Sequence, residues 1–89
     1  MMYPYITFSD ETEVTHSQIL ERNNRREVEV HFERPTENGF DEARCLLPTY
    51  QWIYHTGYTP DELTNLINFI QNNVHVLYKY AEEDGLKIA

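Results

Sequence analysis

The sequence predicts one α+β domain over residues 1–89: an antiparallel meander of about four strands, then a short helix, then one long C-terminal helix packed on the sheet. Segment 27–33 alternates strictly between polar and apolar residues, as a strand does when one face is buried and the other is wet. Residues 59–62 read Thr-Pro-Asp-Glu, a helix start, and an apolar stripe at helical spacing follows them. A length of 89 residues suits one domain.

The strands are expected between residues 5 and 47, at 5–8, 13–20, 27–33 and 43–47. Asn23-Asn24 is the expected centre of a hairpin, because Asn tolerates positive φ better than most residues. Proline cannot donate to a strand ladder, so Pro35 and Pro48 are expected to end their strands. The residues expected to face the core are Val28, Val30, Phe32, Ala43, Cys45 and Leu47.

The helices are expected at about 49–56 and 60–84, with Gly57 closing the first and Gly85 stopping the second. The second helix carries a stripe that is expected to cover the sheet, made of Leu63, Leu66, Ile67, Ile70, Val74, Leu77, Tyr78 and Ala81.

Three apolar residues of the long helix, Phe69, Val76 and Tyr80, fall outside that stripe and share one line of its surface. A row of this kind predicts an interaction surface, most simply for a homodimer or another protein partner. The alternative is cover from within the chain, by the short helix or by Leu86 and Ile88.

The net charge of −8, with only 7 Lys and Arg, disfavours nucleic acid and anionic membranes as partners. The chain contains no apolar run long enough to span a bilayer. We therefore expect neither nucleic acid nor membrane as a partner. No phosphate-binding glycine loop is present, and no cofactor is expected.

The single cysteine, Cys45, excludes an internal disulfide and alternates with apolar neighbours, so it is expected to be a buried, inert thiol. No secretion signal is visible near the first residue, and the cytoplasm is the expected location.

Weak metal-ligand candidates lie on the polar face of strand 27–33. Glu29, His31 and Glu33 share that face, and His16 on the neighbouring strand is the only plausible addition. The competing interpretation is a solvated face balanced by arginines, and we expect no metal site.

The aromatic residues Tyr50, Trp52, Tyr54 and Tyr58 form a possible pocket for a small molecule, with His31 and His55 as candidate catalytic partners. Such a cluster at a strand-to-helix junction also occurs as ordinary core.

The run Phe32–Asp41, followed by Ala43-Arg44-Cys45 and Leu47-Pro48, resembles small bacterial cytosolic proteins of this length that have no assigned activity. The segments Asn73-Val74-His75 and Tyr78–Ala81 fit the same resemblance. The resemblance implies a bacterial cytosolic origin, and it assigns no site residues.

These observations favour a non-enzymatic protein-interaction or regulatory module, acting through its long helix and acidic sheet face. The alternative is a small ligand-binding protein or enzyme that uses the aromatic pocket with histidines. The sequence disfavours an enzyme but does not exclude one.

Overall fold

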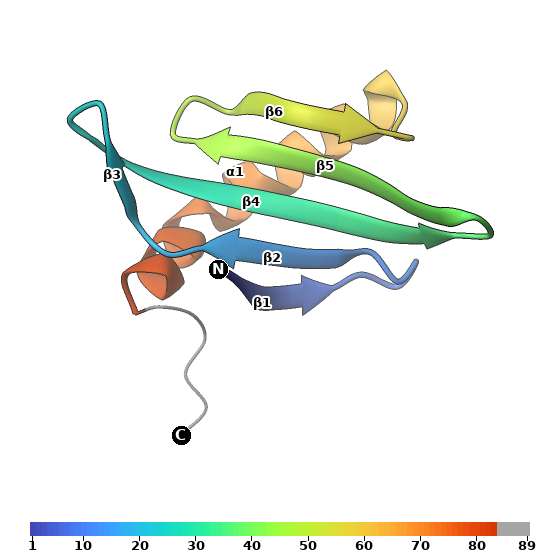
Figure 1. The fold of residues 1–89 in the computed structure, drawn as a ribbon, viewed down its shortest axis with the longest axis horizontal. Coiled ribbons are helices and arrows are strands. Elements are labelled where there is room, and N and C mark those ends of the chain that lie inside the picture. Colours follow the sequence, from blue (N-terminus) through green and yellow to red (C-terminus); the bar gives the residue numbers. More distant parts are fainter. Residues whose placement is uncertain (84–89) are drawn as a thin grey trace.

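The computed structural model describes residues 1–83 and shows a six-stranded antiparallel sheet with a single helix on one face (Figure 1). The sheet order is β1-β2-β4-β5-β6, and β3 pairs with the beginning of β4. This confirms the predicted α+β class and its C-terminal helix. The elements are β1 (Met2–Thr7), β2 (Glu13–Ser17), β3 (Leu20–Arg22), β4 (Arg25–Thr36), β5 (Gly39–Leu47), β6 (Gln51–Thr56) and α1 (Pro60–Glu82).

The core lies between the central strands and α1. Val28, Val30 and Phe32 on β4 are fully buried, so the predicted inward face is confirmed. The predicted inward residues of β5 are fully buried too. The opposite face of the sheet, turned toward the viewer in Figure 1, is covered by no element of residues 1–83.

The prediction of about four strands is wrong in two places. The predicted strand 13–20 is two strands, because β2 pairs with the middle of β4 while β3 pairs with its start. At the break between them, the backbone N–H of Glu29 donates to the Ser17 hydroxyl at 2.9 Å. The Asn23-Asn24 turn is confirmed, with φ of 52° and 60° at the two residues.

The predicted short helix over 49–56 is the second error, since this segment forms the edge strand β6. Its aromatic and β-branched residues suit a strand, and one edge of β5 is available for pairing. Gly57 has the predicted positive φ, at 88°, but it follows a strand instead of a helix. A Cβ at this position would lie 1.9 Å from Asp41 Oδ1, so any other residue would have to displace the carboxylate that pairs with Arg34.

The end of β4 also differs from the prediction, whereas the start of α1 agrees with it. Pro35 does not end β4, which runs one residue further to Thr36. Helix α1 begins as predicted, because Thr59 and Glu62 form a reciprocal capping box. The predicted helix end at 84 and the stop at Gly85 lie outside the described residues.

The predicted apolar stripe of α1 is confirmed as the face that packs on the sheet. Its buried members are Leu66, Ile70, Leu77 and Ala81, and its half-buried members are Leu63, Ile67, Val74 and Tyr78.

Candidate functional site

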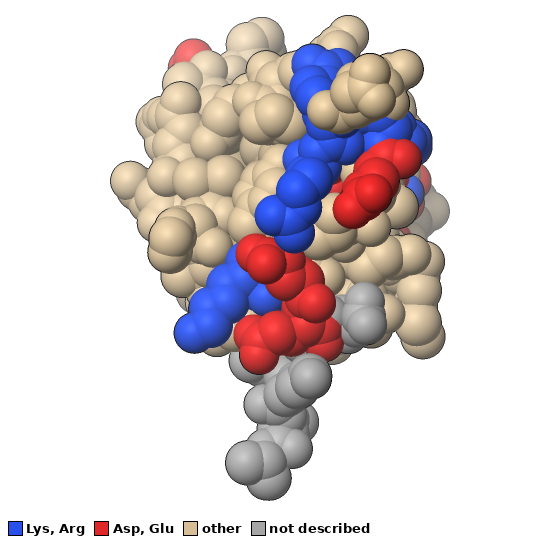
Figure 2. Space-filling model, turned by 90° about the vertical axis from the view of Figure 1, so that its left-hand side faces the viewer, with Lys and Arg blue, Asp and Glu red and all other residues tan. Residues whose placement is uncertain are grey.

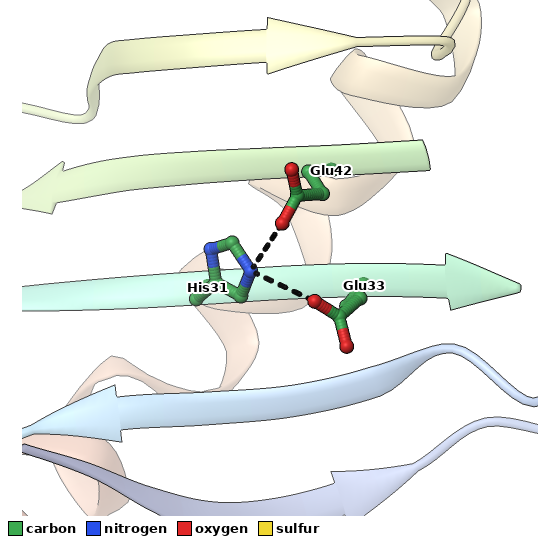
Figure 3. Close-up of side chains that lie close together, drawn as sticks. All are labelled: His31, Glu33 and Glu42. Atoms are coloured by element: carbon green, nitrogen blue, oxygen red, sulfur yellow. Dashed lines mark ion pairs between the residues drawn. The ribbon is translucent and has the colours of Figure 1, made fainter. Parts of the chain in front are cut away.

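A group of polar side chains lies on the sheet face opposite α1. The β4–β5 register places His31 beside Arg44 and Glu33 beside Glu42. Figure 3 shows both carboxylates approaching one ring nitrogen of His31. His31 Nε2 lies 3.8 Å from Glu33 Oε1 and 3.6 Å from Glu42 Oε1. Sequence reasoning found His31 and Glu33 but missed Glu42, because only the pairing of two strands brings it there.

The contacts of the other ring nitrogen of His31, Nδ1, show which nitrogen of the neutral ring carries the proton. Arg44 Nε donates to His31 Nδ1 at 3.3 Å, and the Tyr54 hydroxyl lies 3.3 Å from the same atom. Since a guanidinium only donates, Nδ1 must be the unprotonated nitrogen and the neutral ring carries its proton on Nε2. Burial lowers the pKa of His31, the Arg44 charge lowers it further, and Glu42 and Glu33 oppose the shift.

These hydrogen bonds argue against a metal ion at His31, although His31, Glu33 and Glu42 bring their ligand atoms within 4.8 Å of one another. Metal-bound histidines usually donate their second N–H to a carboxylate or carbonyl. With a metal on Nε2, a neutral ring would carry its proton on Nδ1, where it would face the Arg44 donor. The arrangement therefore fits a neutral, hydrogen-bonded imidazole better than a metal ligand.

The other two metal candidates are engaged elsewhere. Glu29 lies on the same face but pairs with Arg44 at 3.1 Å and with Arg22 at 3.1 Å. His16 pairs in register with Val30, which places it on the α1 side of the sheet, away from His31. There it is fully buried, and its Nδ1 donates to the Ser17 carbonyl at 2.9 Å.

The four aromatic residues of the predicted pocket do not share one cavity wall. Trp52 is paired with buried Cys45 and packs beside Phe32, on the α1 side. Tyr54 is paired with Arg44 and lies against His31, on the opposite side. The extra residue between them, Ile53, forms a β-bulge, which sequence alternation does not reveal.

Tyr50 and Tyr58 belong with Trp52 on the core side, and Tyr58 is buried there. His55 lies near Trp52, with ring centroids 6.4 Å apart, and His31 lies on the other face. The histidines and aromatic residues therefore do not converge on one site.

The helix row of Phe69, Val76 and Tyr80 is partly covered from within the molecule. Phe69 packs edge-on against Phe8, with centroids 4.9 Å apart, and Tyr80 lies 5.9 Å from Tyr5. Val76 is 37% exposed. The cover comes from β1 and the residue after it, which the sequence analysis did not place there. The row therefore does not form one continuous exposed stripe.

The arginines at the β3–β4 hairpin are neutralised by acidic neighbours. Arg22 pairs with Glu27 at 2.9 Å, Arg25 pairs with the same carboxylate at 3.4 Å, and Arg26 pairs with Glu82 at 3.5 Å. Figure 2 looks onto this end of the molecule and shows basic and acidic side chains side by side. A phosphate backbone would have to displace these carboxylates to reach the arginines.

Strand β6 is a feature that sequence analysis missed, since a helix was expected there. It pairs with β5 along one edge and is the last strand of the sheet (Figure 1). Its six residues, Gln51–Thr56, include no charged residue and no proline. Ile53 and Tyr54 are 48% and 42% exposed. The sequence does contain a signal for a strand here, the high β-propensity of Trp-Ile-Tyr, to which the helix interpretation gave too little weight.

No protein-family model matches this chain, and comparison with curated proteins and with solved structures finds no significant match. The resemblance to small bacterial proteins stays a prediction. No helix within residues 1–83 is long and apolar enough to cross a membrane. Function must therefore be inferred from the geometry of the chain itself.

Proposed function

We propose that this protein is a non-enzymatic interaction module that binds an extended segment of another protein along strand β6. The observation that carries the proposal is an uncharged edge strand, left uncovered by the other elements of residues 1–83, in a strongly charged protein. One quarter of all residues are charged, yet none of the six residues of β6 is. Proteins usually protect such an edge with Lys, Pro or a covering element.

The opposite edge of the sheet provides a comparison. Strand β1 carries Pro4, which has no N–H to offer an incoming strand, and a bulge lies between Pro4 and Ile6. Strand β6 also has a bulge, at Ile53, and each strand exposes one isoleucine, but β6 has no proline and also exposes Tyr54. The chemistry of β6 therefore favours strand addition more than that of β1 does.

Strand addition obtains its affinity from main-chain hydrogen bonds and its specificity from alternating side chains. An incoming segment would meet Tyr54 on the His31 face and Trp52 on the α1 face, so we expect a partner strand with apolar or aromatic residues. The net charge of −8 favours a partner that is neutral or basic beside this strand.

A non-enzymatic role is supported by the state of the polar cluster. His31 is hydrogen-bonded at Nδ1, and its Nε2 faces two carboxylates. Arg44 is engaged by Glu29 and His31, so the ring nitrogen of His31 that could accept a proton, Nδ1, already faces a donor. We propose the cytoplasm as the location, in keeping with the buried, unpaired Cys45.

The test is a matched pair of edge variants, Ile53→Lys on β6 and Ile6→Lys on β1. Both isoleucines are 48% exposed on edge strands, so neither change is expected to disturb the core. Wild type and variants serve as bait in lysate of the native cell, and bound complexes are then examined by hydrogen exchange. We expect a partner retained by wild type and Ile6→Lys, lost with Ile53→Lys, and protecting amides 51–56. Equal retention by both variants, or protection elsewhere, would reject the proposal.

A further inference from the structure

Strand β6 is connected to the polar cluster on the sheet face opposite α1 through Tyr54. This residue pairs with Arg44 in the β5–β6 register, and its ring reaches across β5 to His31 on β4, with ring centroids 6.0 Å apart. The Tyr54 hydroxyl and Arg44 Nε both lie 3.3 Å from His31 Nδ1. The guanidinium carbon of Arg44 also lies 5.9 Å from the centre of the Tyr54 ring. The side chain that a partner strand would meet on this face of β6 therefore contacts a group that can take up a proton.

The Nδ1 atom of His31 has one lone pair, so it accepts a hydrogen bond when the ring is neutral and none when the ring is protonated. Once protonated, Nδ1 is a donor and faces the Arg44 guanidinium, which is also a donor and a cation. Arg44 must then leave Nδ1, and it keeps its bond to Glu29 at 3.1 Å. The Tyr54 hydroxyl can stay only by changing from donor to acceptor. Protonation of His31 therefore changes the contacts of both side chains.

The charges around His31 determine when this change occurs. The titratable and charged groups around the ring are Glu13 on β2, Glu29 and Glu33 on β4, Glu42 and Arg44 on β5, and Tyr54 on β6. Burial and the Arg44 charge lower the pKa of His31 from 6.5, and Glu42 and Glu33 oppose the shift. The ring is therefore neutral at pH 7, and it takes up its proton on the acidic side of pH 6.5.

We propose that His31 is a proton-controlled switch for strand β6, and that its protonation weakens the binding of a partner strand there. This inference rests on the proposed strand addition at β6. A partner side chain that packs on Tyr54 excludes water from the cluster and so favours the neutral ring, and by reciprocity the proton disfavours the partner. Protonation also adds a positive charge to the sheet face beside β6, where we expect a neutral or basic partner. Both effects favour release of the partner in acid.

The first experiment needs no partner. It is an NMR titration of the full chain from about pH 8 to about pH 5, which follows the His31 ring, Arg44 Nε and the amides of 51–54. Because β6 contains a histidine of its own, the comparison is between His55→Asn and the double variant His55→Asn with His31→Asn. Asparagine at position 31 keeps an accepting oxygen near the place of Nδ1 but takes up no proton.

We expect Arg44 and the 51–54 amides of His55→Asn to shift with the midpoint of the His31 ring, and the double variant to lose this shared transition. Separate midpoints, or a transition that survives in the double variant, would overturn the switch. Arg44→Gln provides a test that keeps His31 itself. It removes the charge that lowers the His31 pKa, so it should raise the midpoint of the ring, and an unchanged midpoint would contradict the proposal.

The second experiment repeats the lysate measurement at about pH 7.5 and about pH 5 with the same two proteins as bait. His55→Asn should retain the partner that Ile53→Lys loses at least fivefold less at the lower pH, and retention by the double variant should change less than twofold. An equal loss with both baits would overturn the switch and leave strand addition standing. Absence of any partner that depends on Ile53 would instead reject strand addition, and this inference with it, even where the NMR midpoints agree.

Discussion

Two neighbouring residues of α1, Val76 and Leu77, allow a direct test of how the helix faces the sheet. Leu77 is fully buried, and Val76 is 37% exposed. Both residues lie in the interior of α1 and both are replaced by Ala, so the two variants change adjacent positions of the same helix. The difference between them therefore reports burial.

The expected magnitude follows from the atoms that are removed. Leu77→Ala deletes three buried carbon atoms, which is worth about 2.4 kcal/mol at ~0.8 kcal/mol per methylene. The cavity left behind adds to this loss, so we expect a total of about 3–5 kcal/mol. A domain of this kind has about 5–15 kcal/mol of stability in all. A loss of 3 kcal/mol lowers the Tm by roughly 12–24 °C. Val76→Ala should stay within about 0.5 kcal/mol of wild type.

The assay is urea unfolding followed by Trp52 fluorescence and by far-UV circular dichroism, with equal m-values required for all three proteins. A Leu77→Ala loss below about 1 kcal/mol would show that the helix does not pack on this face. An equal loss with Val76→Ala would show that Val76 is covered, for example in a dimer, and the loss would then depend on protein concentration.

Three further predictions concern the helix start and the cysteine. Thr59→Ala removes the hydroxyl that accepts from the Glu62 backbone, and it should cost about 1 kcal/mol in urea unfolding, whereas Thr64→Ala in the same helix should not. Hydrogen bonds from Arg34 and from the Thr59 backbone lower the pKa of Glu62 from 4.5 to about 2, so the folded state binds this proton less readily than the unfolded state. Stability from this group is complete above pH 4.5 and is lost as the pH falls toward 2; Glu62→Gln should have a flatter acid limb, and an unchanged limb would contradict the assignment. Burial raises the pKa of Cys45 to about 12, so a thiol reagent should label it slowly in native buffer and rapidly in denaturant, and fast native labelling would show an accessible thiol.

Much of the local structure follows from the sequence. The alternation at 27–33 correctly predicts that Val28, Val30 and Phe32 face the core, because the side chains of a strand have a period of two. The Asn23-Asn24 turn and the Thr59–Glu62 cap are equally local, since each depends on hydrogen bonds or φ values within a few residues.

The candidate sites are less accessible to sequence reasoning. His31 and Glu33 are two residues apart on one strand, so their shared face was predictable, whereas Glu42 joins them only through the β4–β5 register. The contact of Tyr54 with His31 joins β6 to β4 across β5, and no spacing in the sequence relates the two residues.

The sequence by itself determined the features with short-range causes: the α+β class, the inward face of β4 and the start and apolar stripe of α1. Only the tertiary structure decided that segment 51–56 is an edge strand, because its residues suit a strand once the edge of β5 is available. It also decided that Phe69 and Tyr80 are covered by Phe8 and Tyr5, since the first residues of the chain pack beside a helix that lies near its other end. Strand pairing and such cover depend on the neighbour that a residue meets in space, and periodicity along the chain does not contain that information.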